Sequence, residues 1–113
     1  MINFDAFSDA MGGDSDMMSM IIELYHEEHA NDLNKIQEQY TSNDLDGLFI
    51  TVHSLKGVLL TLCEDTASEQ FEVIERMCKQ GTKPEAQIIN EVLNEMVKVN
   101  QQIAALPLKI ESQ

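Results

Sequence analysis

Hydrophobic side chains recur every three or four residues along most of this chain, and polar side chains fill the positions between them. This spacing is the period of an amphipathic α-helix, and the segments are rich in Leu, Ile, Met, Glu and Gln, which favour helix. No segment shows the sustained alternation with β-branched residues that predicts a strand. We therefore expect one short helix and four longer ones, at residues 4–10, 16–40, 45–62, from Asp65 or Thr66 to Gly81, and from Pro84 to Pro107.

Short connections separate the predicted helices. Asp14 or Ser15 is the expected N-cap of the second helix, Asn43 or Asp44 that of the third, and Pro84 stands in the first turn of the last. Connections of about 2 to 6 residues make consecutive helices antiparallel neighbours. The pattern predicts a single domain over residues 1–113, an all-α, antiparallel up-down four-helix bundle with a short N-terminal capping helix.

The predicted helix at residues 45–62 carries a histidine on its outward face. At about 100° per residue, a complete core stripe lies on the side opposite His53, and Val52 lies at its edge. This stripe comprises Leu48, Thr51, Leu55, Val58, Leu59 and Leu62. His53 therefore points to solvent, among Phe49, Ile50 and Leu60. A solvated face does not need these three apolar side chains, so we interpret them as a docking patch for a partner.

Lys56 and Gly57 share the outward face with His53. A glycine inside a helix costs up to about 1 kcal/mol relative to alanine. Gly57 removes a side chain one turn from the imidazole, and we interpret it as giving a partner close access. A neutral imidazole is a nucleophile, and the ammonium of Lys56 can neutralise a phosphoryl group bound to it. No second acid or base is placed to complete a hydrolytic triad, so the pattern favours a phosphoryl carrier over a hydrolase.

The composition narrows the possible partners. The chain has 113 residues with 7 Lys+Arg against 20 Asp+Glu, a formal net charge of −13, which argues against nucleic acid and anionic membranes. No apolar run approaches the roughly 18 residues of a membrane span, and the N-terminal residues are typical of neither a secretory signal nor a transit peptide. Cys63 and Cys78 make a poor disulfide framework. We expect a cytoplasmic monomer with reduced thiols, and Met1 with the compact length favours a free-standing chain.

Around His53 the sequence resembles the histidine-containing phosphotransfer (HPt) domain family. The family motif H-x-L-K-G stands here as H-S-L-K-G at residues 53–57. G-G-D at residues 12–14 resembles the family's turn before its second helix, and residues 71–76, with Glu75, resemble its helix after the site. The resemblance covers residues 2–106. The family commonly has small residues after the motif, whereas V-L-L follows here, so we expect Leu60 to influence partner choice.

The resemblance implies a phosphorelay intermediate of two-component signal transduction. His53 would accept a phosphoryl group from the aspartyl phosphate of a response-regulator receiver domain and pass it to the aspartate of another receiver. Lys56 would support the phosphoryl group. The partners would be receiver domains, hybrid sensor histidine kinases or both, and the receiver would supply Mg²⁺, so the chain needs no cofactor of its own. The resemblance implies no kinase activity, and the chain has no Gly-rich phosphate loop or nucleotide-binding motif.

Other motifs support weaker alternatives. His26 and His29 are spaced i, i+3, whereas the zincin motif needs i, i+4, so we expect no metal site and interpret this stretch as a solvated helix face. Ser15 is similar to the phosphopantetheine serine of acyl carrier proteins, but Asp16 follows it where Leu or Met is usual. The main alternative is an acidic helical docking adaptor, which would bind a partner through the apolar patch without phosphotransfer.

Overall fold

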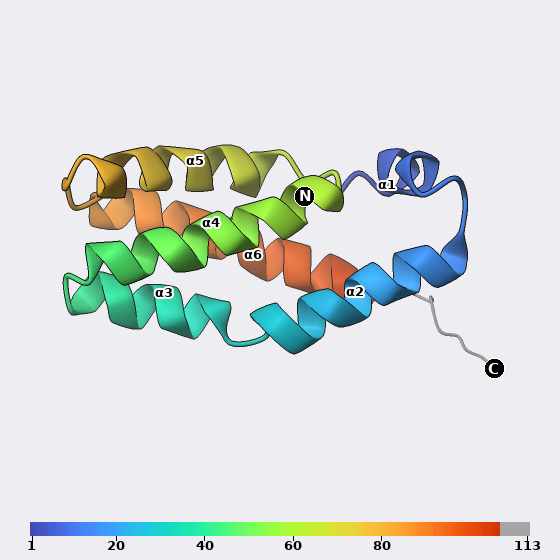
Figure 1. The fold of residues 1–113 in the computed structure, drawn as a ribbon, viewed down its shortest axis with the longest axis horizontal. Helices are drawn as coiled ribbons and strands as arrows, with labels where there is room; N and C mark the ends of the chain where they lie inside the picture. Colours follow the sequence, from blue (N-terminus) through green and yellow to red (C-terminus); the bar gives the residue numbers. More distant parts are fainter. Residues whose placement is uncertain (107–113) are drawn as a thin grey trace.

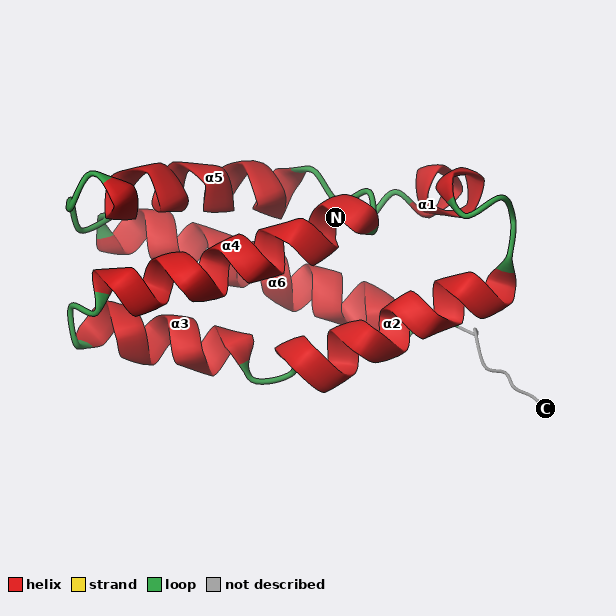
Figure 2. Cartoon of the chain, viewed as in Figure 1, coloured by secondary structure: helices red, strands yellow, loops and turns green. Residues whose placement is uncertain are grey.

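The computed structural model describes residues 1–106, and its regular structure is helical (Figure 2). Within these residues the only strand-like pairing is an isolated bridge between Ile2 and Glu64. The predicted all-α class is therefore confirmed. The helices are α1 (Phe4–Ala10), α2 (Ser15–His29), α3 (Asp32–Thr41), α4 (Leu45–Thr61), α5 (Thr66–Lys79) and α6 (Ala86–Ala104).

The predicted helix at residues 16–40 is wrong, because the chain forms two helices there. Helix α2 ends at His29 and α3 begins at Asp32, and Asn31 between them leaves the helical conformation, with φ −107° and ψ 9°. Figure 1 shows the axes of α2 and α3 offset at this point. The apolar stripe stops here, while the side chains of His29 and Asp32 are both buried and joined by a 2.6 Å contact. Burial of this polar pair favours the break over a continuous helix.

Acidic side chains start three of the helices. The carboxylates of Asp14 and Asp44 accept hydrogen bonds from first-turn backbone N–H groups of α2 and α4, which selects these two of the alternatives predicted for those caps. At α5 the helix begins at Thr66 with Asp65 in the N-cap position, as predicted, but the Asp65 side chain makes no capping hydrogen bond. The buried carboxylate of Glu64 accepts the hydrogen bonds of two backbone N–H groups there instead.

The connection between α5 and α6 departs slightly from the prediction. Gly81 follows the end of α5 with φ 76°, a left-handed conformation that favours glycine, as expected for a helix stop. Pro84, however, precedes α6 instead of lying in its first turn, and its carbonyl accepts a hydrogen bond of 2.8 Å from the Tyr40 hydroxyl on α3. The contact ties this loop to α3. The predicted stop at Pro107 lies outside the described residues.

Helix α4 lies between α3 and α5 in the bundle. It packs along both helices, and α5 also packs on α6. Helix α1 contacts α2 at the right-hand end of the molecule in Figure 1. The fully buried hydrophobic side chains come from five helices and the α4–α5 connection: Phe7, Ile36, Leu48, Val52, Leu55, Leu59, Leu62, Ala67, Phe71, Ile74, Val92, Met96 and Val99. Helix α4 therefore turns one face into the core and leaves the other face open.

Candidate functional site

The open face of α4 presents His53 to solvent. Its side chain is 65% exposed, whereas Leu48, Val52 and Leu55 on the opposite side are fully buried. The outward direction predicted for His53 from helical periodicity is confirmed. Of the predicted core stripe, only Val58 differs, because it is half-buried.

Phe49 is less exposed than the sequence suggested. Its side chain is half-buried and packs against the hydrophobic core. Its ring stacks on the imidazole of His53, with 5.8 Å between the ring centroids and 4° between the planes. Phe49 therefore orients the histidine ring as well as contributing surface, whereas Ile50 and Leu60 are exposed as predicted.

Glu75 on α5 contacts the Nδ1 atom of the His53 imidazole. Its Oε1 lies 2.8 Å from Nδ1 of His53, and the residue is only 8% exposed. An ionised carboxylate can only accept a hydrogen bond, so Nδ1 carries the proton and Nε2 keeps the lone pair. The buried partner thus fixes the tautomer and the orientation of an exposed nucleophilic nitrogen.

The contact between Glu75 and His53 does not follow from the helical periodicity of either helix alone. A signal for it was present, because Glu75 lies four residues after Phe71 and beside Ile74, on the apolar stripe of α5. A carboxylate on a core-facing stripe requires a polar partner. Periodicity could have marked Glu75 as unusual, although the identity of its partner depends on how α5 packs on α4.

Lys56 binds the same carboxylate. Its Nζ lies 2.6 Å from Oε2 of Glu75 and 3.9 Å from a carboxylate oxygen of Glu72, and the lysine side chain is 19% exposed. The contact with Oε2 is an ion pair, and that oxygen forms no aligned hydrogen bond with the described residues. Burial by itself would raise the pKa of Glu75, but the contacts with Lys56 and His53 outweigh it and lower that pKa below its usual value. Glu75 is therefore ionised at neutral pH.

Gly57 lies on open surface one turn after His53. Apart from its chain neighbours and the backbone of its own helix, a Cβ atom added at this position would meet no atom of residues 1–106 within 4 Å. Packing within the chain therefore does not require glycine here.

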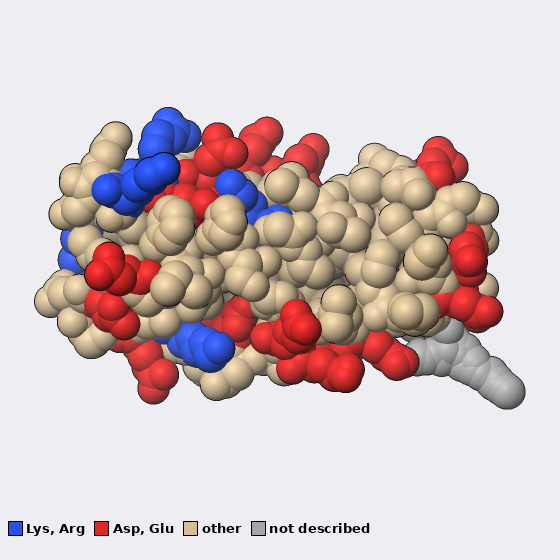
Figure 3. Space-filling model, viewed as in Figure 1, with Lys and Arg blue, Asp and Glu red and all other residues tan. Residues whose placement is uncertain are grey.

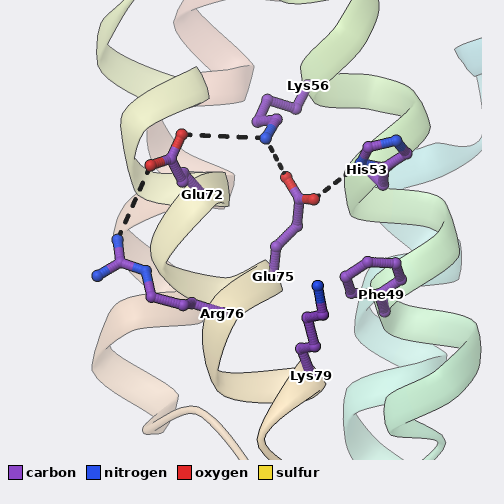
Figure 4. Close-up of a pocket in the computed structure, with 7 residues that line it drawn as sticks. All are labelled: Phe49, His53, Lys56, Glu72, Glu75, Arg76 and Lys79. Carbon is purple, nitrogen blue, oxygen red and sulfur yellow. Dashed lines mark hydrogen bonds and ion pairs between the residues drawn. The ribbon is translucent and has the colours of Figure 1, made fainter.

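A hollow between α4 and α5 brings the charged groups together (Figure 4). It is lined by Phe49, His53, Lys56, Glu72, Glu75, Arg76 and Lys79. The hollow thus contains three cationic side chains, two carboxylates and the histidine. On the face seen in Figure 3, basic side chains gather over the C-terminal half of α5, whereas acidic ones dominate along α2. An exposed imidazole nitrogen beside clustered cations is suited to accepting an anionic phosphoryl group.

The remaining predicted site residues lie apart from this hollow. Ile50 lines a second hollow, with Asp46, Phe49, Cys78 and Lys79. Leu60 lies two turns beyond His53 and lines neither hollow. The structure therefore brings Phe49, His53 and Lys56 together in one hollow, whereas Ile50 and Leu60 do not line it.

The two histidines of α2 have different environments. His26 is exposed, but His29 is buried against Asp32, so the prediction of a solvated face for this stretch is wrong at His29. Within residues 1–106, no three His, Cys, Asp or Glu side chains are grouped closely enough to hold a metal ion. Ser15 is the first residue of α2, and the side chain of Asp14 caps that helix.

Comparison with known families identifies one match. The family model for the Hpt domain matches residues 20–106, which include His53, Lys56, Gly57 and Glu75. No curated protein and no solved structure matches the chain. In the part of the chain that the structure describes, no helix combines the length and apolar character needed to cross a membrane.

Proposed function

The chain belongs to the Hpt domain family, and from this premise we propose that it carries a phosphoryl group on His53 between the aspartates of receiver domains. Members of the family are histidine-containing phosphotransfer modules of two-component signalling, and they are phosphocarriers rather than kinases. The observation that carries the proposal is the state of the His53 ring, whose Nδ1 is held by buried Glu75 while the side chain stays 65% exposed. In this proposal α2 and α3 together form one member of an up-down four-helix bundle.

Transfer begins with attack by Nε2 of His53 on the phosphorus of an aspartyl phosphate. The new P–N bond forms as the P–O bond to the aspartate breaks, and the aspartate leaves as a carboxylate. Nδ1 keeps its proton, so the ring gains positive charge, which the adjacent carboxylate of Glu75 balances. The second transfer reverses these steps, because a carboxylate of the next receiver attacks the phosphorus and the imidazole leaves.

In this proposal, the residues around His53 position the phosphoryl group and neutralise its charge, and they take no part in making or breaking its bonds. Phosphoryl transfer needs in-line positioning and compensation of charge. We propose that the ammonium of Lys56 compensates the negative charge of the phosphoryl group. It lies beside Glu75, the residue that contacts the imidazole of His53. The receiver would bring Mg²⁺ and the acceptor aspartate. Open space at Gly57 would let the receiver approach, and Phe49, Ile50 and Leu60 would contact it. We propose that the chain acts as a monomer.

The test is phosphoryl incorporation from phosphoramidate and, separately, from a phosphorylated receiver domain. We expect wild-type protein to take a label that is stable in base and labile in acid, and His53→Gln to take none. His26→Gln is the matched control, because His26 is an exposed histidine on another helix. Absence of label from both donors in folded wild-type protein would overturn the proposal and leave the docking adaptor as the better account.

Lys56→Ala tests the role assigned to that ammonium. We expect slower transfer from the receiver with helicity retained, because buried apolar side chains hold α4 in place. Stopped-flow or quench measurement of the transfer rate, with circular dichroism for the fold, is the readout. An unchanged transfer rate would contradict the role assigned to Lys56.

A further inference from the structure

Helix α2 has a second apolar stripe on the side that faces away from the core. Its buried stripe consists of Met18, Ile22, Tyr25 and His29. In the outer stripe every side chain is at least 46% exposed, and its members are Met17, Met20 and Leu24. A single exposed apolar residue is ordinary on a protein surface, but a contiguous exposed stripe is typical of a surface that binds a partner.

The outer stripe lies in a shallow hollow, the α2 hollow, formed by Met17, Met20, Ile21, Glu23, Leu24 and Glu27. These six positions form two overlapping sets with the spacing i, i+3, i+4, i+7. The set that starts at Met17 is wholly apolar, and the set that starts at Met20 includes both glutamates. When two helices pack, four side chains with this spacing surround the hole into which one side chain of the facing helix inserts. The α2 hollow therefore has the form that accepts another helix.

Within residues 1–106, no other helix lines the α2 hollow. Figure 1 shows the N-terminal half of α2 extending beyond the ends of α4 and α5, with α1 beside it. The residues of the α2 hollow line neither of the two hollows beside α4. The α2 hollow is therefore a surface separate from the one that contains His53.

The charge around the α2 hollow determines which helix fits it. Residues 1–34 contain eight Asp or Glu and no Lys or Arg. Glu23 and Glu27 are exposed, and neither forms an ion pair within residues 1–106. A second copy of α2 would bring further carboxylates against these two, which is repulsive. A helix with Lys or Arg beside its apolar stripe would neutralise them.

We infer that the α2 hollow is a docking site for a basic amphipathic helix of a partner protein. An apolar side chain of that helix fills the hole that starts at Met17. A Lys or Arg one turn further along contacts Glu23 and Glu27 at the other hole. This inference goes beyond the proposed phosphotransfer, because a partner bound here holds the chain while His53 stays open to a receiver.

The test measures binding of a synthetic helical peptide by fluorescence anisotropy at low salt. The probe has three heptads, with Leu at the two core positions of each heptad and Lys at the flanking positions. We expect it to bind wild-type protein, and a second peptide with Glu in place of Lys not to bind. Met20→Gln keeps the net charge and should weaken binding about tenfold, because it removes buried apolar contact. Val97→Gln is the control, since Val97 is an exposed apolar residue of α6 outside the α2 hollow, and we expect it to bind as wild type does.

A pair of neighbouring glutamates tests the charge requirement. Glu27 lines the α2 hollow, whereas Glu28 is exposed but does not line it. Glu27→Gln and Glu28→Gln change the net charge equally. We expect Glu27→Gln to weaken binding of the basic peptide about threefold at low salt and less at high salt, and Glu28→Gln to leave it unchanged.

Four results would each overturn the inference. The basic peptide does not bind wild-type protein, or the control variants weaken binding as much as Met20→Gln and Glu27→Gln, which would mean general attraction to an acidic chain. Sedimentation shows a wild-type dimer that Met20→Gln makes monomeric, so that a second copy is the occupant. Met20→Gln slows transfer from a receiver domain, so that the receiver is the occupant. Peptide binding requires no phosphoryl label, so failure of the proposed function is distinguishable from failure of this inference.

Discussion

The molecule contains two histidine–carboxylate pairs that differ in almost everything except their chemical groups. In the first, Nδ1 of His53 on α4 lies 2.8 Å from a carboxylate oxygen of Glu75 on α5. In the second, Nδ1 of His29 lies 2.6 Å from a carboxylate oxygen of Asp32, across the break between α2 and α3. The distances alone do not distinguish His53, the proposed phosphoacceptor, from His29.

The two pairs differ in how they meet solvent. The side chain of His53 is 65% exposed, whereas that of His29 is 6% exposed. In both pairs the carboxylate is nearly buried, so each holds its imidazole in place. Only at His53 is the ring open to an approaching partner. A carboxylate contact therefore orients a histidine, and exposure of the rest of its ring makes it available for chemistry.

Replacing each histidine with glutamine is expected to give the largest contrast between the two pairs. His53→Gln should lose all phosphoryl incorporation, because the nucleophile is gone, and His29→Gln should retain it. The measurement is the base-stable label from phosphoramidate on samples whose helicity is checked by circular dichroism. Loss of helicity in His53→Gln would contradict the outward position of that side chain.

The same two variants are expected to show the opposite order in stability. His29→Gln disturbs a buried pair at a helix break, where the other ion pair of Asp32 within residues 1–106 is with Lys35, at 4.0 Å. The free energy of unfolding should fall by about 2 kcal/mol, because a buried hydrogen bond is disturbed. His53→Gln leaves Glu75 paired with Lys56 and should change it by less than about 1 kcal/mol. Urea denaturation measures both, and equal losses would refute the distinction between the pairs.

Substitutions of the two carboxylates, Glu75 and Asp32, are expected to differ in their effect on the rate of phosphoryl labelling. Glu75→Gln keeps a hydrogen-bond acceptor near Nδ1 but removes the charge that balances the phosphorylated ring. We expect the initial rate of labelling to fall about tenfold, which corresponds to about 1.4 kcal/mol in the barrier. Asp32→Asn is the control, with an expected loss of stability and an unchanged rate in the folded protein. A wild-type rate in Glu75→Gln would remove Glu75 from the mechanism.

Acidification should weaken the contribution of Glu75 to stability. Its contacts lower the pKa of the folded-state carboxyl below the unfolded value. The stabilisation is therefore present above the unfolded pKa and is lost as pH falls through the lower folded pKa. We expect the stability difference between wild type and Glu75→Gln, measured by urea denaturation, to shrink between neutral and acidic pH. A difference that stays constant would mean that Glu75 has the same pKa in both states.

The smallest effect on labelling by phosphoramidate is expected at Gly57. Gly57→Ala places a methyl group in open space, so it should stabilise α4 by about 0.5 to 1 kcal/mol without changing labelling by phosphoramidate. Gly57→Phe should keep the fold and the phosphoramidate reaction but block transfer from a receiver domain. Undiminished receiver transfer in Gly57→Phe would overturn the access role of the glycine.

Local periodicity was sufficient to predict α1, α4, α5 and α6 and the direction of His53. A helix advances by about 100° per residue, so the apolar stripe of α4 already determines which side chains face away from it. The acidic residues Asp14 and Asp44 likewise mark helix starts. An N-cap is a contact between residues two or three positions apart, so it depends on the local sequence alone. These are properties of short stretches of chain.

The tertiary structure decided the features that depend on contacts between distant residues. Residues 16–40 consist largely of helix formers, so propensity predicts one helix there, whereas burial of His29 and Asp32 ends α2 and starts α3. Glu75 is 22 residues from His53, and only the packing of α5 on α4 brings the two side chains together. That packing also places Lys56 on a carboxylate and leaves Lys79 unpaired within residues 1–106, because the partner of a charged side chain depends on which helices are neighbours.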